Sequence, residues 1–355
     1  MATLAQIRPR VLAVGGGKGG VGKSMVTAML GICLASLGKR TVLIDADLNG
    51  ADLHRYLAMP DPDATLLDYI ERRINDLDQL LQRSRFPNLR FIPGVPGPLM
   101  SPTIKHWCKI KLLRQVHSIQ ADYVLFDLSA GQSNHTLDFF LCADDGIVVT
   151  TCDPLALCNA FGFIRAALMR KLSRTFSYAP EVTRCLLEAA DLSCGEAVQS
   201  IHKTMEQMPD LPDNWRLLID RQLSTFRAKV ILNQIAGEGT IQGAGALQIA
   251  VNELMHTRME NWGGIHYDRC VQGAAKNLEP STLMSPGGPA SEDIVRIVHR
   301  HILARELNAV RASEARVEIP ARICNYRCLI WNCCSSRIGG LPCAKTAPVS
   351  LAQPG

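Results

Sequence analysis

Short runs of apolar residues alternate with longer segments of helical periodicity along most of this chain. Four apolar runs, at residues 11–14, 41–44, 123–127 and 146–151, have the length of strands buried on both faces. Between such runs, apolar positions recur at helical spacing, most clearly over residues 24–37. Strands that alternate with helices are typical of a parallel sheet covered by helices. The pattern therefore predicts an α/β fold with a mostly parallel central sheet and helices on both faces.

The alternation continues further along the chain, with one interruption. Residues 89–94 and 229–234 are additional predicted strands, and residues 289–310 form a predicted closing helix whose apolar stripe should pack on the sheet. Residues 172–228 interrupt the alternation with helical, partly acidic sequence, which we interpret as a helical insertion at a surface connection. The sequence thus predicts one domain over residues 1–310 that contains this insertion.

The segment 311–355 differs in composition from everything before it, because Ser, Gly, Pro and Ala dominate it. Its cysteines are Cys324, Cys328, Cys333, Cys334 and Cys343. Their spacing lacks the C-x2-C pair of common zinc sites, and no histidine lies nearby. We therefore expect a poorly ordered tail, with a thiolate metal site as the alternative.

Composition and charge narrow the class of protein. The chain has 355 residues, 47% of them hydrophobic, and a formal net charge of +5 in which 33 acidic residues offset most of the 38 basic ones. This small excess gives no argument for nucleic-acid binding. No apolar run is long enough for a membrane span, and residues 1–10 lack the apolar core of a secretory signal. Together with scattered single cysteines, these features predict a cytoplasmic protein with reduced thiols.

A glycine-rich loop follows the first predicted strand. Residues 15–24 read GGGKGGVGKS, which contains the phosphate-loop pattern G-x-x-x-x-G-K-[ST]. Glycines let successive main-chain N–H groups approach phosphate oxygens without a Cβ in the way. Lys23 supplies a charge for the β- and γ-phosphates, Ser24 offers a hydroxyl to Mg²⁺, and the following helix directs its positive end at the anion. The predicted phosphate-binding residues are Gly17, Lys18, Gly19, Gly20, Val21, Gly22, Lys23, Ser24 and Met25.

Carboxylates follow two of the predicted strands. Asp45 and Asp47 come directly after residues 41–44, and Asp127 ends a later strand. In an open α/β sheet, ligands bind beyond the carboxyl ends of the strands, where these side chains and the loop should meet. We assign Asp45 and Asp127, together with Ser24, to the metal site. Asp47 is our candidate for orienting the attacking water, because phosphoryl transfer depends mainly on positioning and charge neutralisation.

Two of these motifs give the chain a family resemblance. KGGVGKS, residues 18–24, resembles the deviant Walker A signature of the MinD/ParA family of dimerising P-loop ATPases. VLIDADL, residues 42–48, resembles the strand and acidic pair that follow this signature in the family. The likeness extends over about residues 8–305, and the segments 45–54 and 121–131 are most similar to the branch of flagellar-number and polar site-determining ATPases.

The resemblance implies ATP and Mg²⁺ as ligands, with hydrolysis of ATP. It implies that Lys18 reaches across a two-fold interface to the nucleotide of a second copy, so that the homodimer depends on ATP. It also implies that Asn233 contacts the adenine base and that Gly131 belongs to the second switch element, where Ser129 replaces the Pro or Gly of many members. Asp52 stands where relatives usually have Asn, which adds a carboxylate near ATP and favours slow turnover.

The function that follows from this resemblance is a regulatory ATPase switch that positions or counts a cellular structure, such as flagella, through protein partners. Family members often dock on the inner face of the cell membrane through a C-terminal amphipathic helix. Here, however, packing on the sheet better explains the helix at 289–310. The predicted helix near residues 103–119 carries Lys105, Lys109, Lys111 and Arg114. We interpret these as a basic, solvent-exposed face, with a partner or lipid surface as the alternative.

Two other functions stay open. A metal-cluster carrier or reductase of this fold would place a cysteine just after the second switch, where residues 131–134 contain none. An ATP-dependent amide synthase of the cobyrinic acid type needs a glutaminase region with a nucleophilic Cys and a His partner, which we cannot assemble from residues 240–355. The regulatory switch is therefore the preferred hypothesis.

Overall fold

The computed structural model describes residues 8–47, 50–95, 104, 106–177, 184, 213–237, 242–277 and 283–304. The chain divides into two compact units, Met1–Leu303 and Ala304–Gly355, and the fold described below is that of the first. The predicted tail at 311–355 and the predicted domain boundary at 310 lie outside the described residues.

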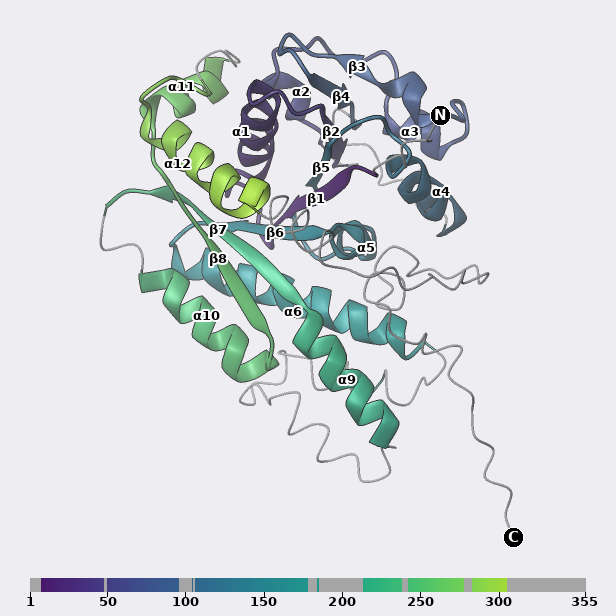
Figure 1. The fold of residues 1–355 in the computed structure, drawn as a ribbon, viewed down its shortest axis with the longest axis vertical. Coiled ribbons are helices and arrows are strands. Elements are labelled where there is room, and N and C mark those ends of the chain that lie inside the picture. The colour runs from purple at the N-terminus through teal and green to yellow at the C-terminus, as the bar shows by residue number, and fades with distance from the viewer. Residues whose placement is uncertain are drawn as a thin grey trace, which may run out of the picture. The chain divides into compact units, whose positions relative to one another are not determined.

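One sheet forms the centre of the first unit (Figure 1). Within the described residues its eight strands lie in the order β3-β4-β2-β5-β1-β6-β7-β8. In chain order they are β1 (Arg10–Gly15), β2 (Thr41–Ala46), β3 (Gln82–Arg83), β4 (Leu89–Ile92), β5 (Tyr123–Leu128), β6 (Asp145–Thr150), β7 (Arg227–Ile235) and β8 (Arg258–His266). Of these eight described strands, only the two-residue strand β3 pairs antiparallel, with β4. The predicted mostly parallel sheet is confirmed.

Helices cover both faces of this sheet. They are α1 (Lys23–Ser36), α2 (Leu53–Tyr56), α3 (Leu66–Ile70), η1 (Leu77–Leu80), α4 (His106–Val116), α5 (Asn134–Cys142), α6 (Pro154–Thr175), α9 (Asp213–Thr225), α10 (Gln242–Met255), α11 (Arg269–Asn277), α12 (Pro289–Ile297) and the π-helical turn η4 (Val298–Leu303). Leu12 and Val14 of β1 pack in one core cluster with α1 and α12, whereas Val11 and Ala13 pack in another with α4, α5 and α6. This alternation along a buried strand places one apolar layer on each side of the sheet.

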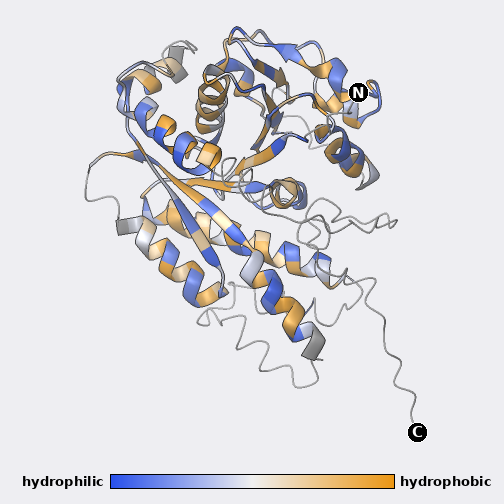
Figure 2. Ribbon diagram, in the orientation of Figure 1, coloured by the Kyte–Doolittle hydropathy of each residue, from blue (hydrophilic) through white to orange (hydrophobic). Residues whose placement is uncertain are grey.

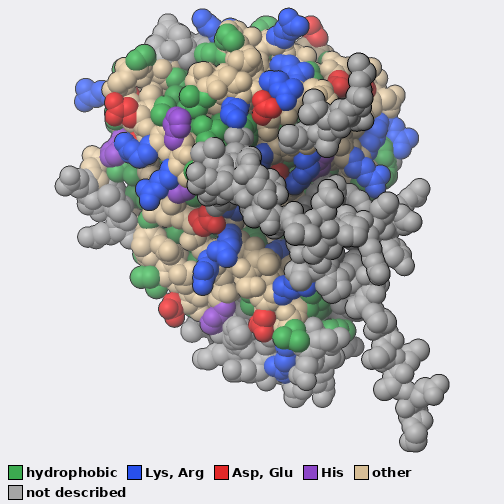
Figure 3. Space-filling model, viewed as in Figure 1, with side chains coloured by type: hydrophobic (Ala, Val, Ile, Leu, Met, Phe, Trp, Pro, Cys, Tyr) green, Lys and Arg blue, Asp and Glu red, His purple; other side chains and the backbone are tan. Residues whose placement is uncertain are grey.

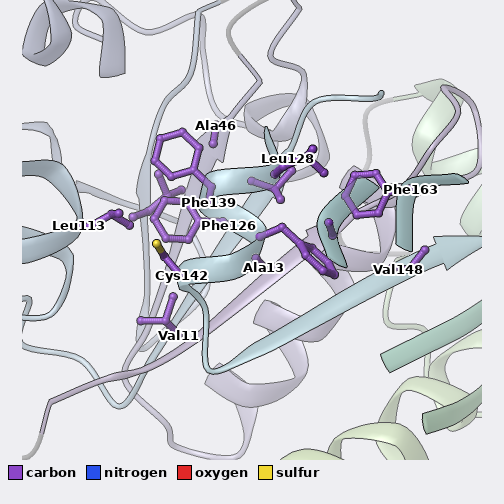
Figure 4. Packing of buried hydrophobic residues seen from close by; sticks show 14 of the residues in the cluster. Val11, Ala13, Ala46, Leu113, Phe126, Leu128, Phe139, Cys142, Val148 and Phe163 are labelled. Atoms are coloured by element: carbon purple, nitrogen blue, oxygen red, sulfur yellow. The ribbon is translucent and has the colours of Figure 1, made fainter. Parts of the chain in front are cut away.

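The distribution of apolar residues explains why these elements assemble. In Figure 2 the central strands are largely hydrophobic, and the helices carry both hydrophobic and hydrophilic residues. Figure 4 shows part of the layer beneath α4, α5 and α6, where Phe139 lies beside Phe126. The two rings stack with centroids 5.6 Å apart. Contacts of this kind bury most of the aromatic surface and fix α5 against the end of β5.

The predicted closing helix is confirmed as far as the structure describes it. Ile294, Ile297, Val298 and Ile302 of α12 and η4 are buried in the cluster that contains α1. The guanidinium of Arg10 donates to the carbonyl oxygen of Ile302 at 2.6 Å, which ties the end of η4 to the first strand. The apolar stripe of this segment therefore packs on the sheet, as the sequence predicts.

The basic face predicted for the helix near 103–119 needs a correction. Lys109 of α4 is buried and forms an ion pair with Asp138 of α5. Lys111 donates to the carbonyl oxygen of Asn75 at 2.8 Å, and Arg114 is exposed. Lys105 lies outside the described residues. The interpretation as a solvent-exposed face was wrong for Lys109, because its charge has a buried partner on the next helix.

The helical insertion predicted at 172–228 is described only in part. Helix α6 continues to Thr175, α9 is helical as expected, and β7 begins at Arg227. Residues 178–183 and 185–212 lie outside the described residues. On the face drawn in Figure 3, Lys and Arg side chains are interspersed with Asp and Glu. Over the described ranges, none of the helices combines the length and apolar character that a membrane crossing requires.

Candidate functional site

The glycine-rich loop lies between the end of β1 and the start of α1, at the carboxyl edge of the sheet. A Cβ atom on Gly17 would lie 2.0 Å from the backbone oxygen of Asn159 in α6, so only glycine fits there. Gly22 has a φ of 90°, a left-handed conformation that disfavours other residues. The loop is therefore held in one compact conformation by its own glycines.

The two lysines of this loop have opposite environments. Lys23 is 9% exposed, and its Nζ donates to the backbone oxygen of Lys18 at 3.4 Å. Burial lowers the pKa of Lys23, while the neighbouring carboxylates of Asp127 and Asp47 oppose that shift. The side chain of Lys18, in contrast, is exposed. One lysine therefore points into the site and the other lies on its outer surface.

The predicted metal-binding carboxylates meet at the ends of β2 and β5. Asp45 and Asp127 are register partners and are both buried. Asp45 accepts hydrogen bonds from the backbone N–H groups of Asp47, at 3.1 Å, and Leu53, at 3.0 Å. The hydroxyl of Thr27 on α1 lies 3.2 Å from Oδ1 of Asp127. Thr27 was not predicted from the sequence, although it lies one helical turn after Lys23.

Electrostatics at this edge favour a cation. Burial raises the pKa of Asp127 to about 6, against the opposing effect of a hydrogen bond from Ser24. Burial, followed by the charge of Asp127, raises the pKa of Asp45 well above its usual range. Two carboxylates and a hydroxyl are the hard oxygen ligands that Mg²⁺ prefers. Among the described residues no three or more His, Cys, Asp or Glu side chains form a candidate metal cluster.

The loop after β5 touches the glycine-rich loop directly. The N–H of Gly131 donates to the carbonyl oxygen of Gly16 at 3.3 Å. Two residues later, Ser133 caps the start of α5 by accepting a hydrogen bond from the N–H of Thr136 at 3.1 Å. The predicted second switch element thus lies against the loop and leads straight into a capped helix.

A pocket of about 300 Å³ extends from the loop along the sheet edge. Its wall includes Lys23, Ser24 and Met25 of α1, Tyr56 of α2, Asn233 of β7 and Asp268 after β8. The pocket therefore joins the predicted phosphate-binding residues to residues from the far end of the chain.

Asn233 is buried in this pocket and also supports the loop. Its Nδ2 donates to the carbonyl oxygen of Val21 at 2.8 Å. A Cβ on Gly22 would lie 2.3 Å from the same Nδ2 atom, so the amide is in close contact with the loop. The predicted contact with an adenine base stays a prediction, and the structure adds a positioning contact with the phosphate-binding loop.

Asp268 lines the pocket in the loop after β8. Its Oδ1 accepts from the N–H of Cys270 at 2.8 Å. Its Oδ2 is buried and has no hydrogen-bond partner among the described residues. A buried acceptor of this kind suits a ligand that offers N–H donors, such as the amino group of adenine.

The structure brings most of the predicted site residues together. Those that line the pocket are Gly20, Gly22, Lys23, Ser24, Met25 and Asn233. Asp127 is hydrogen-bonded to Ser24 of this wall, Asp45 is the register partner of Asp127, and Asp47 is half-buried after the end of β2. Lys18 and Gly19 are exposed on the outer part of the loop, while Val21 is buried. Thr27, Tyr56 and Asp268 were not among the predicted site residues.

Known proteins with related sequences support this interpretation of the loop. Residues 12–280 match the CobQ/CobB/MinD/ParA nucleotide binding domain. The chain is 32% identical over 170 residues to the antiactivator FleN of Pseudomonas aeruginosa, which covers 46% of this chain and 59% of FleN. It is 32% identical over 168 residues to the septum site-determining protein MinD of Synechocystis, which covers 46% of this chain and 62% of that protein. The chain thus spans less than two thirds of either relative.

Solved structures show the same fold. The MinD protein of Pyrococcus horikoshii complexed with Mg-ADP superposes with a TM-score of 0.55 at 18% identity, covering 87% of this chain and 100% of that one. A chain of the MinC:MinD cell division protein complex of Aquifex aeolicus gives a TM-score of 0.53 at 21% identity, covering 88% of this chain and 99% of that one. Because the matched domain accounts for more than half of its residues, the chain belongs to the CobQ/CobB/MinD/ParA family of nucleotide binding domains.

Proposed function

We propose that this chain is an ATPase that dimerises when ATP is bound and acts as a switch in the positioning or number control of a cellular structure such as flagella. Members of its family are ATPases in general. The FleN relative is an antiactivator, and the MinD relatives are septum site-determining proteins. By analogy with these relatives, the proposed switch acts through protein partners. We place it in the cytoplasm, with peripheral contact at the inner face of the cell membrane as the alternative.

One observation carries the proposal: the loop holds one buried and one exposed lysine. Lys23 already supplies the charge that phosphates need inside the site. The exposed Lys18 has no part in the same subunit's pocket wall, so it is available to the nucleotide of a second copy. A two-fold interface then gives each site one lysine from each subunit.

The other residues have separate tasks at this site. The loop N–H groups and Lys23 hold the phosphates, and Ser24, Asp45 and Asp127 would hold Mg²⁺, which neutralises phosphate charge when it is bound. The carboxylate of Asp47 is near enough to Lys23 to raise the pKa of that lysine against the effect of burial. In the proposed mechanism, Asp47 orients the attacking water. The carboxylate of Asp52 lies 3.5 Å from Nε of Arg55, so this ion pair offsets part of its repulsion of ATP.

The mass of the protein in solution tests the proposal. Wild type should be a dimer with ATP and Mg²⁺ and a monomer with ADP, measured by size-exclusion chromatography with light scattering. Lys18→Ala should bind ATP as wild type does but remain monomeric, and Asp47→Ala should stay dimeric because hydrolysis is blocked. Lys39→Ala, which replaces a partly exposed lysine after α1, is the control for loss of a positive charge outside the loop. A wild-type mass that is the same with both nucleotides would contradict the switch.

A further inference from the structure

Tyr56 comes from a helix outside the nucleotide motifs, yet it lines the pocket beside Lys23, Ser24 and Met25. Its helix, α2, is anchored by Leu53 and Leu57, which are buried in the same core cluster as α1. These two anchors leave Tyr56 half-buried, with its ring packed on the cluster and part of its surface in the pocket. These core contacts therefore set the position of Tyr56 at the pocket wall.

The same helix is fixed to the first acidic segment by one carboxylate. Oδ2 of Asp45 accepts from the N–H of Leu53, the first residue of α2. Oδ1 of Asp45 accepts from the N–H of Asp47, the candidate for positioning water. A shift of α2 would therefore change a hydrogen bond of the carboxylate that also holds Asp47.

The surroundings of the ring are suited to a nucleoside. Met25, Ile265 and Val271 give the pocket apolar surface in addition to the ring of Tyr56. Burial raises the pKa of Tyr56, and the carboxylates of Asp127 and Asp52 add to that shift, so the hydroxyl stays neutral. A neutral aromatic ring next to aliphatic side chains packs well against a planar base or the face of a ribose.

We propose that the ring of Tyr56 packs against the nucleoside part of the bound nucleotide and thereby couples occupancy of the pocket to the position of Asp47. This inference rests on the proposed function, because it takes ATP as the ligand. Tyr56 acts as a positioning residue: it contacts the part of the ligand that does not react, and its helix transmits the contact to Asp45.

Comparing ATP with inorganic tripolyphosphate tests the contact, because the second ligand has the phosphate chain without a nucleoside. Binding is measured by calorimetry with Mg²⁺ for wild type, Tyr56→Ala, Tyr56→Phe and Met59→Ala. Met59 packs on the same cluster but is not part of the pocket wall, so it is the matched control. We expect Tyr56→Ala to weaken ATP roughly 10- to 100-fold and to leave tripolyphosphate unchanged. Tyr56→Phe and Met59→Ala should bind both ligands as wild type does.

Three results would overturn the contact. They are an unchanged affinity of Tyr56→Ala for ATP, an equal loss for both ligands, and a Tyr56→Phe protein as weak as Tyr56→Ala. The second result would mean that the substitution disturbs the phosphate site. A wild-type protein that binds tripolyphosphate but not ATP would contradict the proposed function itself, which separates the two failures.

Hydrogen exchange tests the coupling. The N–H groups of Asp47 and Leu53 both donate to Asp45, so their exchange reports on this junction. Saturating Mg-ADP should slow the exchange of peptides that contain these two amides in wild type and in Met59→Ala. The slowing should be smaller in Tyr56→Ala at an ADP concentration that also saturates the variant. Equal protection in Tyr56→Ala would show that the ring does not couple the pocket to Asp47.

Discussion

Asp45 and Asp127 face each other as register partners on the parallel strands β2 and β5, with both carboxyl groups buried. If both ionise, two negative charges share one site of low dielectric. The raised pKa values of both groups reflect this cost, with burial as the larger cause. In the nucleotide-free protein, the two buried carboxylates therefore destabilise the folded state at neutral pH. A bound cation would reduce their repulsion.

Removing the charge of Asp127 should stabilise the nucleotide-free protein at neutral pH. The pKa of this group is about 6 in the folded protein and about 4 in the unfolded chain. Ionisation therefore disfavours the folded state, with a cost that begins near pH 4 and is complete above the folded pKa.

In chelator, Asp127→Asn should raise the free energy of unfolding at pH 7.5 by up to about 3 kcal/mol. The gain should be about 1 kcal/mol smaller at pH 5. Urea unfolding at both pH values measures the difference, and a gain that is independent of pH would show that Asp127 ionises normally.

The same carboxylate should determine how much Mg²⁺ contributes to nucleotide binding. For wild type, adding Mg²⁺ to saturating ADP should raise the melting temperature further, because the ion neutralises Asp127 and phosphate together. Asp127→Asn and Ser24→Ala should lose most of this Mg²⁺-dependent increment. Asp122→Asn, which lies one residue before β5 with its side chain 33% exposed, should keep it. A full increment in Asp127→Asn would remove this residue from the metal site.

Local signals explain which parts of the fold could be predicted. The central strands contain buried apolar runs, and the glycine-rich loop has its residues within one short segment. The closing helix has its buried side chains at helical spacing, and Ile294, Ile297 and Val298 occupy the core as expected. In each case the residues that determine the structure are neighbours in the sequence, so their spacing contains the information.

Features that depend on distant partners could not be predicted in this way. The buried charge of Lys109 needs Asp138, which lies on a helix for which the sequence analysis gave no prediction. The contact of Asn233 with Val21 joins residues 212 positions apart. Tyr56 enters the pocket only because α2 packs against α1. The spacing of residues along the chain does not indicate which distant polar or aromatic side chains meet at the same place in the fold.

The contact of Asn233 with Val21 leads to a prediction that separates two roles. If Asn233 only reads the base, Asn233→Ala should weaken ATP and leave inorganic tripolyphosphate unchanged. Because its Nδ2 holds the loop carbonyl at 2.8 Å, we expect both ligands to bind more weakly, by roughly 5- to 10-fold, the value of one lost hydrogen bond. Asn233→Asp should be worse, because it places a carboxylate against the same carbonyl. Calorimetry with both ligands decides, and loss for ATP alone would leave base contact as the only role.

Asp138 is the centre of a buried charge cluster that should contribute much more to stability than a surface ion pair. It binds Lys109 of α4 and, from α6, Nε of Arg170 at 2.9 Å and Nη1 of Arg174 at 3.2 Å. Burial disfavours its charge, but hydrogen bonds from Arg170 and Lys109 hold the pKa of Asp138 below its usual range. Asp138→Asn leaves three cations without their shared counter-ion and should lower the free energy of unfolding by about 3–5 kcal/mol.

In the control Asp122→Asn, the partner Arg40 has a side chain 58% exposed, so the loss should be at most about 1 kcal/mol. Urea unfolding of both variants gives the comparison, and equal losses would mean that the cations around Asp138 are already well solvated.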